Sequence, residues 1–374
     1  MNKGSTMPSK SNDNIRPLKL ADGTTVNALY PRIVSASRST DIPAFYLDWF
    51  FKRLDAGYSI WTNPFNGKQM YVAYADTRFI VFWSKNPAPL LPRLNHLARK
   101  GLGCYVQYTL NDYVREGYEP NVPPLEERLE TFRQLSRALG SQAVIWRFDP
   151  LLLTDRLRAD DLLRKIACIG NALHGYAEKL VFSFADINCY RKVRANLLRK
   201  GIRWEDWTSE SMRAFAAKLQ DLNTRRGWGY VLATCAEEID LDDLGIAHNR
   251  CIDDRLMLRL APDDAELRQA LGYELRQTPG QLPLSDQIAA HHRTQDAVDL
   301  GHGRLAFKTG GKHSPDSGQR KACGCVTSKD IGQYNTCKHG CVYCYANSSE
   351  ETAMANHAAH TRHSDAPTVT PVNS

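Results

Sequence analysis

The sequence lacks the features that identify several common classes of protein. No apolar run approaches the roughly 18 residues that a membrane-spanning helix needs, so no membrane association is expected. The polar first segment, MNKGSTMPSKSNDN, has no apolar core of the kind found in secretory signals. These absences predict a cytoplasmic protein, and disulfide frameworks are uncommon in that compartment.

Familiar nucleotide-binding motifs are also missing. There is no G-x-G-x-x-G after an expected strand and no G-x-x-x-x-G-K-[ST], so dinucleotide-fold oxidoreductases and P-loop NTPases lack support. The chain has no run of lysines and arginines interleaved with aromatic residues. Its net charge of +7 and pI near 8.8 are only mildly basic. Nucleic acid is therefore a permitted partner that the sequence does not indicate.

The 374 residues, 43% hydrophobic and 24% charged, are typical of a globular protein. Residues 1–28 and 348–374 are polar or of low complexity, and both are expected to be disordered. Residues 29–278 are expected to form a β/α barrel domain. Residues 279–347 are interpreted as a crossover that leads into a C-terminal segment rich in cysteine.

Short, almost continuously apolar runs alternate with helical patterns in the central region, as in sheets buried on both faces. The expected strands span residues 32–37, 58–63, 79–84, 104–110, 143–148, 179–184 and 229–234. The expected helices span residues 125–139, 159–173 and 209–222. Repeated strand–helix units favour a parallel sheet. The expected fold class is therefore α/β and TIM-barrel-like, as a complete or partial β/α barrel, with an open doubly wound sheet as the alternative.

Polar residues follow many of these strands, where barrels of this type carry their functional groups. Arg147 and Asp149 stand out because a charged pair bounds an apolar strand, and Glu237 follows the last expected strand. We take these three residues as catalytic candidates. The alternative is that such residues satisfy loop backbone groups or begin helices. The other polar strand-end residues are Arg38, Asp41, Asn63, Lys85, Asn86, Gln107, Thr109, Ser183, Asp186, Glu238, Asp253 and Asp254.

Ten cysteines are present, and three of them, Cys337, Cys341 and Cys344, form a C-x3-C-x2-C motif in TCKHGCVYCYAN. Closely spaced thiolates let one loop wrap an iron–sulfur cluster, and three ligands leave one iron free for chemistry. Gly340 gives the loop freedom to turn tightly. Tyr343 is expected to pack beside the cluster and limit solvent access.

A second pair, Cys323 and Cys325, lies just upstream. The sequence leaves three roles open for this pair: ligands of an auxiliary metal centre, a redox-active thiol, or a source of sulfur. Two cysteines are too few for a closed tetrahedral site, so a metal there would need further ligands. Structural zinc, with four ligands drawn from the five cysteines between Cys323 and Cys344 and from His339, is the main competitor of iron–sulfur. Zinc ribbons, however, usually use paired C-x2-C knuckles.

The C-x3-C-x2-C spacing and Tyr343 resemble the cluster-binding motif of radical S-adenosylmethionine (SAM) enzymes. The string GCVYCYA is similar to the version in the spore photoproduct lyase and DNA-photolyase-like branch. SASRSTDIP, IVFWSKNP, VIWRFDP, TCAEE, CIDD and the terminal cluster resemble an uncharacterised bacterial family with a radical-SAM-like cysteine cluster at its C-terminus. This resemblance runs from about residue 32 to 347.

The resemblance implies a 4Fe-4S cluster on Cys337, Cys341 and Cys344, with S-adenosyl-L-methionine bound at the open iron. It also implies reductive cleavage of SAM and hydrogen abstraction from a small-molecule or nucleotide-like substrate. A reductant such as flavodoxin or ferredoxin would supply the electron. Arg147, Asp149 and other strand-end residues would contact SAM or substrate.

Two departures from ordinary radical SAM proteins stand out. The cluster motif lies at the opposite end of the chain, so the chain is circularly permuted or its tail folds back over the barrel mouth. No glycine–glycine–glutamate run follows an early strand. Two functions without SAM chemistry remain as alternatives: a metal-stapled nucleic-acid-binding module and a redox or sulfur-transfer iron–sulfur protein.

Overall fold

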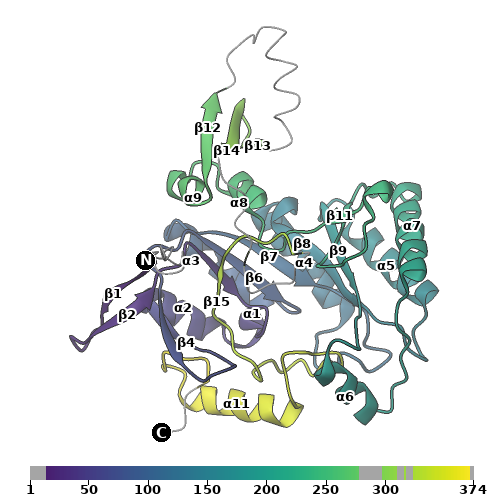
Figure 1. Ribbon diagram of the computed structural model, residues 1–374, viewed down its shortest axis with the longest axis horizontal. Coiled ribbons are helices and arrows are strands. Elements are labelled where there is room, and N and C mark those ends of the chain that lie inside the picture. Colours follow the sequence, from purple (N-terminus) through teal and green to yellow (C-terminus); the bar gives the residue numbers. More distant parts are fainter. Residues whose placement is uncertain (1–13, 278–296, 310–315, 317–322, 371–374) are drawn as a thin grey trace, which may run out of the picture.

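The computed structural model describes residues 14–277, 297–309, 316 and 323–370. Within these residues the chain is mixed α/β and is built on an eight-stranded sheet in which all neighbouring strands are parallel (Figure 1). In spatial order its strands are β11 (Ala247–His248), β10 (Val231–Thr234), β9 (Lys179–Phe184), β8 (Val144–Leu151), β7 (Gly103–Thr109), β6 (Phe79–Ser84), β3 (Ile33–Ala36) and β15 (Lys329–Asp330). The parallel α/β class is therefore confirmed. Among the described strands, β11 and β15 lie at opposite ends and do not pair, so no closed barrel is observed.

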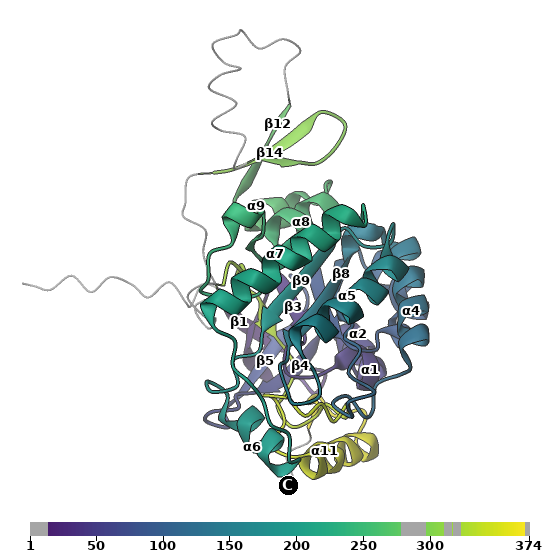
Figure 2. The same cartoon turned by 90° about the vertical axis from the view of Figure 1, so that its right-hand side faces the viewer.

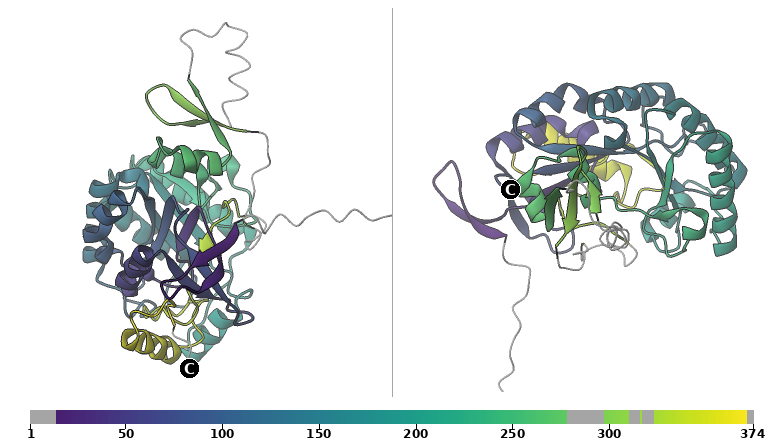
Figure 3. Two further views of the ribbon diagram at one scale, coloured as in Figure 1. Left: turned by 90° about the vertical axis from the view of Figure 1, so that its left-hand side faces the viewer. Right: turned by 90° about the horizontal axis from the view of Figure 1, so that it is seen from above.

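The described helices are α1 (Ile42–Phe45), α2 (Leu47–Ala56), α3 (Leu94–Arg99), α4 (Leu125–Leu139), α5 (Ala159–Leu173), α6 (Arg191–Arg199), α7 (Ser209–Arg225), α8 (Asp254–Leu260), α9 (Ala265–Ala270) and α11 (Glu350–Arg362), with short 3-10 turns η1 (Ala88–Arg93), η2 (Ser141–Ala143) and η3 (Asp242–Leu244). Several of them, including α4, α5 and α7, pack along one face of the sheet and form an arc when the molecule is seen from above (Figure 3). The expected helices at 125–139, 159–173 and 209–222 correspond to α4, α5 and α7. None of the helices in the described part of the chain has the length and apolar character needed to cross a bilayer.

Apolar side chains fill both faces of the main sheet. On the face covered by α4, Phe132 stacks on Tyr108 of β7, with ring centroids 5.5 Å apart and planes 17° apart, and neither side chain is exposed. On the opposite face, α8 contributes Met257 to a second cluster that includes Tyr105 and Ile145. Burial on both faces explains why these strands are continuously apolar in the sequence.

Two small sheets flank the main one. The first has the order β1 (Ile15–Lys19), β2 (Thr25–Leu29), β5 (Gln69–Ala73) and β4 (Tyr58–Thr62). The second, β12 (Tyr273–Gln277), β14 (Arg304–Lys308) and β13 (Ala297–Asp299), projects beyond α8 and α9 (Figure 2). The expected strand at 58–63 exists as β4, but it pairs antiparallel with β5 rather than joining the main sheet. Only Ser59 and Ile60 of β4 are buried, whereas its other three residues are partly exposed.

Two segments that the composition predicts to be disordered contain regular structure. The first 28 residues include β1 and most of β2, and the tail includes α11. The Ser349 hydroxyl accepts a hydrogen bond from the Thr352 N–H at the start of α11, and His360 packs against Tyr46 with ring centroids 4.7 Å apart. Tertiary contacts therefore order a segment whose composition alone carries little helical signal. Much of the expected crossover at 279–347 lies outside the described residues.

Phe132→Ala is expected to lower the free energy of unfolding by about 3–5 kcal/mol, because it leaves a cavity between α4 and β7. Phe65→Ala is the matched control, since the Phe65 side chain is 92% exposed, and it should change stability little. Urea unfolding followed by circular dichroism measures both variants. Similar losses in the two would contradict this assignment of the core.

Candidate functional site

The carboxyl ends of the parallel strands meet at one edge of the main sheet, and the C-terminal segment lies against that edge (Figure 1). Asp41, Lys85 and Asn111 come shortly after β3, β6 and β7, and Asp149 lies within β8. The cysteine loop, residues 336–347, contacts several of these residues through side chains of its own. The polar strand ends and the cysteine motif therefore belong to one site.

The cysteine loop is anchored at its start by Thr336. Its hydroxyl lies 2.7 Å from the Thr40 hydroxyl, and its carbonyl accepts a 2.8 Å hydrogen bond from Tyr46. Further along, the Val342 N–H donates to the carbonyl of Tyr118 at 3.1 Å. The loop is thus held by residues that follow β3 and β7, from the first third of the chain.

Asp330 joins the approach to the loop to the end of β3. Its carboxylate accepts hydrogen bonds from the Ser35 and Ser37 hydroxyls at 2.8 and 2.7 Å, and from the Arg38 N–H at 2.8 Å. The Gly332 N–H is a fourth donor, at 3.0 Å. Such a carboxylate is a strong fixed point, because charge-assisted hydrogen bonds are stronger than neutral ones. The pairing of β15 with β3 is therefore reinforced by side chains.

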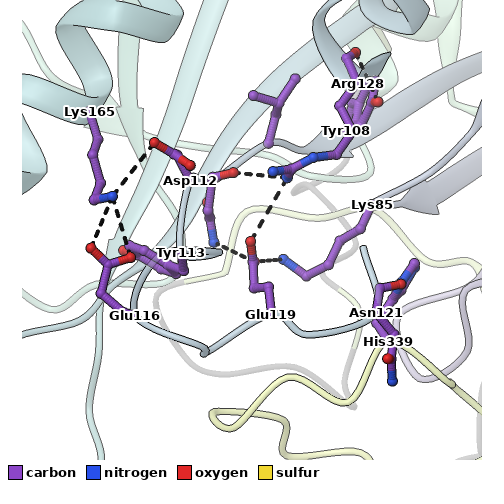
Figure 4. A network of polar contacts seen from close by, with 12 residues as sticks. Lys85, Tyr108, Asp112, Tyr113, Glu116, Glu119, Asn121, Arg128, Lys165 and His339 are labelled. Atoms are coloured by element: carbon purple, nitrogen blue, oxygen red, sulfur yellow. Dashed lines mark hydrogen bonds and ion pairs between the residues drawn. The ribbon is translucent and has the colours of Figure 1, made fainter. Parts of the chain in front are cut away.

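Tyr343, the aromatic residue inside the motif, is held by a buried polar network. Its hydroxyl accepts hydrogen bonds from Lys85 Nζ at 2.9 Å and from Asn111 Nδ2 at 3.2 Å, and it donates to Glu119. Figure 4 shows Glu119 between Lys85 and Arg128. Lys85 Nζ lies 2.8 Å from Glu119 Oε1, and Arg128 Nη1 lies 3.8 Å from Glu119 Oε2.

The electrostatics of this network depend on charge pairing at depth. The side chains of Glu119 and Arg128 have no exposed surface. Burial alone would raise the pKa of Glu119, but the charges of Lys85 and Arg128 hold it below its usual value. Burial and the Glu119 charge raise the pKa of Tyr343, so its hydroxyl keeps the proton that it donates.

His339 forms a second contact between the loop and the strand ends. Its Nε2 lies 2.7 Å from Asp41 Oδ2, and its Nδ1 lies 3.1 Å from the carbonyl oxygen of Asn121. Asp41 also accepts hydrogen bonds from the Ser84 hydroxyl and the Lys85 N–H. Both ring nitrogens therefore have oxygen partners within the protein, which speaks against His339 as a zinc ligand.

Gly340 is required for the turn between the first two cysteines of the motif. Its φ of +69° is the left-handed conformation that glycine adopts without strain. A Cβ added there would also lie 3.0 Å from Asn121 Nδ2 and 3.1 Å from Pro120 Cγ. The tight turn expected from the sequence is present.

The three motif thiols are partly buried. Burial raises the pKa of Cys337 and Cys344, and it raises that of Cys341 to about 12. Neighbouring motif cysteines raise the values for Cys337 and Cys341 further. The thiols are therefore close enough to interact electrostatically. In the part of the chain that the structure describes, however, no group of three or more His, Cys, Asp or Glu residues is arranged to hold a metal ion.

Arg147 and Asp149, the strongest catalytic candidates from the sequence, form an ion pair. Arg147 is buried, and its Nη1 also lies 3.2 Å from Gln107 Oε1. Asp149 is partly exposed and accepts a hydrogen bond from Ser183. The third candidate, Glu237, accepts a 2.9 Å hydrogen bond from the Phe184 N–H, so its carboxylate supports the backbone at the end of β9.

Four cysteines outside the C-x3-C-x2-C motif form a row, which we call the thiol row: Cys235, Cys251, Cys325 and Cys323. Cys235 Sγ and Cys251 Sγ are 3.4 Å apart, Cys325 Sγ accepts a hydrogen bond from the N–H of Ile252 next to Cys251, and Cys325 is near enough to Cys251 and Cys323 to shift their pKa values. Hydrogen bonds from Cys235 and Cys325, together with the charge of Arg147, lower the pKa of Cys251. The hydrogen bond with Cys325 lowers the pKa of Cys323 to about 7. The structure thus brings two scattered cysteines to the pair that the sequence singled out.

Several residues of the site were missed by sequence reasoning. Glu119, Asn111, Asn121 and Arg128 lie in or after the polar segment between β7 and α4. A glutamate in such a segment is ordinarily solvated, and nothing in the local pattern signals that this one is buried. The role of Glu119 is revealed only by its contacts with Lys85 and Tyr343 in the folded molecule.

Comparisons with known proteins place the chain in an uncharacterised group. A family model described as "Domain of unknown function (DUF1848)" matches residues 33–346. No curated protein and no solved structure matches the chain. The match covers the main sheet and the cysteine loop, so both belong to one family domain.

Glu119→Gln is expected to lower the free energy of unfolding by about 3–5 kcal/mol, because Lys85 and Arg128 would stay buried without their counter-charge. Glu130→Gln is the matched control, since Glu130 pairs with Arg133 and Arg137 on the exposed face of α4 and should matter little. Urea unfolding compares the two. Equal stability of both variants would show that the buried pairing does not hold the site.

Proposed function

The chain belongs to the DUF1848 family, and we propose that this member is a radical SAM enzyme with a 4Fe-4S cluster bound by Cys337, Cys341 and Cys344. One observation carries the proposal. The C-x3-C-x2-C loop lies at the edge where the parallel strands end, and Tyr343 within it is fixed by Lys85, Glu119 and Asn111. Functional groups of parallel α/β proteins gather at this edge.

The chemistry of the donor set fits a cluster better than a single ion. Three thiolates from one loop are the usual protein ligands of iron–sulfur clusters. The ligands of one ion must surround one point, whereas thiolates on different irons of a cluster lie farther apart. The absence of a compact ion site among the described residues is therefore compatible with a cluster. The turn at Gly340 gives the loop its curvature.

The residues around the loop would hold it in place while the cofactors act. When bound, a reduced 4Fe-4S cluster and SAM supply cleavage of the sulfonium carbon–sulfur bond and a radical that takes hydrogen from substrate. Lys85 keeps Tyr343 in position and places a positive charge near Cys341, which favours the thiolate form. His339, held by Asp41, orients the turn between Cys337 and Cys341.

In a radical SAM enzyme of this kind, the open parallel sheet would act as a partial barrel, and its mouth would hold SAM and substrate. Asp149 is the best placed of the catalytic candidates, because it lies at the strand ends and is partly exposed. Arg147 and Ser183 orient its carboxylate, so Arg147 is a positioning residue. Glu237 positions the end of β9. A small one-electron donor such as flavodoxin or ferredoxin would supply the reducing electron.

We expect the protein, reconstituted anaerobically with iron and sulfide and then reduced, to give a four-iron electron paramagnetic resonance signal that shifts when SAM is added. Formation of 5′-deoxyadenosine should accompany the shift. Cys341→Ala should abolish both, because it removes one of three cluster ligands.

Cys104→Ala is the matched control, since it removes a partly buried thiol on β7 and leaves the loop intact. This variant should keep the signal and the SAM cleavage of the parent protein. Full SAM cleavage by Cys341→Ala, or bound zinc in place of iron after reconstitution, would overturn the proposal.

A further inference from the structure

The thiol row lies in the apolar cluster on the face of the main sheet that α8 covers, and not on the cysteine loop. Cys235 directly follows β10, and Cys251 follows β11 by a few residues. The Cys251 carbonyl accepts 2.7 Å hydrogen bonds from Tyr105 and Gln107 of β7, so its backbone is firmly placed. Cys325 is buried and its sulfur accepts a hydrogen bond from the Ile252 N–H at 3.3 Å, while Cys323 is partly exposed. Cys251 and Cys325 are thus buried in the middle of the row, and the half-buried Cys235 and Cys323 lie at its two ends.

Two of these sulfur atoms are close to bonding distance. Cys235 Sγ and Cys251 Sγ are 3.4 Å apart, whereas a disulfide bond is about 2.05 Å long. The remaining gap of somewhat over 1 Å is within the reach of side-chain rotation. Cys323 and Cys325 are separated by one residue, so a disulfide between them would close a tight ring and serve only as a transient carrier rather than as the stable product. The inner pair is thus the better placed to become a disulfide.

The surroundings of the inner pair favour a thiolate over a metal ion. Arg147 Nη1 lies 3.1 Å from Cys251 Sγ, and Asn249 Nδ2 lies 3.2 Å from the same sulfur. A guanidinium this close stabilises a negative sulfur and repels a cation. No metal-holding group is found in the described ranges of the chain, and the thiol row lies within those ranges.

We propose that Cys235 and Cys251 are a redox-active dithiol, with Cys325 and Cys323 as the path by which oxidising equivalents arrive from a small-molecule disulfide. This inference does not depend on a cluster or on SAM. The contact between the two sulfurs, the buried position of Cys251 beside Arg147 and the row of thiols that ends at the partly exposed Cys323 carry it.

Each step is a thiol–disulfide exchange that breaks one sulfur–sulfur bond and forms another. The Cys323 thiolate attacks the external disulfide and releases one small thiol. Cys325 attacks the Cys323 sulfur and displaces the second small thiol, which leaves a Cys323–Cys325 disulfide. Cys251 then attacks Cys325 and displaces Cys323, which leaves a Cys251–Cys325 disulfide. Finally Cys235 attacks Cys251 and returns the outer cysteines to thiols. Two electrons and two protons pass from the Cys235–Cys251 pair to the two small thiols.

Oxidation of the pair would change the charge at the candidate active site. Arg147 contacts Cys251 on one side and Asp149 on the other. When Cys251 loses its negative charge, Arg147 is left with Asp149 as its acidic partner at this point. The dithiol therefore sits where its redox state alters the carboxylate that the proposed function uses.

Peptide mapping tests the proposal directly. The whole protein is equilibrated anaerobically in mixtures of reduced and oxidised glutathione, quenched with acid, alkylated and cut with trypsin. Trypsin cuts after Arg226, Arg250 and Arg255, so Cys235 and Cys251 fall on the separate peptides 227–250 and 251–255. A species that joins these two peptides should appear as the buffer becomes more oxidising and disappear when it is made reducing again.

Cys251→Ser should abolish the linked species, whereas Cys104→Ser should leave it unchanged. Full alkylation of Cys235 and Cys251 across the whole redox range would overturn the proposal. So would a bond from peptide 251–255 to the peptide 322–329 that holds Cys323 and Cys325, if it accumulated as the end product in oxidising buffer in place of the bond to peptide 227–250. Zinc or iron that survives loss of Cys337, Cys341 and Cys344 but not Cys251→Ser would show a metal site instead. Failure of SAM chemistry would leave the linked species unaffected, so the two proposals fail independently.

Discussion

The position of the cysteine loop depends on one buried carboxylate. Glu119 has no exposed surface, and Lys85 and Arg128 balance its charge. Because an unpaired charge at this depth costs several kcal/mol, the three side chains must come into place together. Tyr343 joins the same network from 224 residues further along the chain. The cysteine loop is thus fixed to the sheet by a buried polar network, and this network is complete only when the surrounding fold is in place.

Features with a local cause could be predicted from the sequence. The buried strands of the main sheet and the helices α4, α5 and α7 have strong local patterns, and the structure has all of them. The order in which strands pair has no local signal in the sequence. For this reason β4 was expected in the main sheet, and the sequence did not reveal that β11 and β15 are unpaired end strands of an open sheet. The tail helix α11 was missed because its order comes from contacts with distant residues such as Tyr46.

The same division applies to the candidate site. The C-x3-C-x2-C motif and the turn at Gly340 are short-range patterns, and Arg147 and Asp149 stand out because they interrupt an apolar strand. Glu119 looks like an ordinary loop residue, because burial is a property of the folded molecule. Cys235 and Cys251 likewise appear isolated in the sequence, and only the parallel arrangement of β10 and β11 brings them together. The candidate site and the thiol row therefore also depend on contacts between residues that are far apart in the sequence.

The pairing of β15 with β3 has a consequence for how the protein is made. Ser35 on β3 and Asp330 on β15 are hydrogen-bonded although 295 residues separate them. While the ribosome is still translating the intervening sequence, β3 is without this neighbour and leaves one sheet edge exposed, and such edges promote aggregation. A chaperone bound at that edge would protect the nascent chain. Any cofactor on the cysteine loop must be inserted after translation of this segment, since the three cysteines of the motif follow Asp330 in the chain.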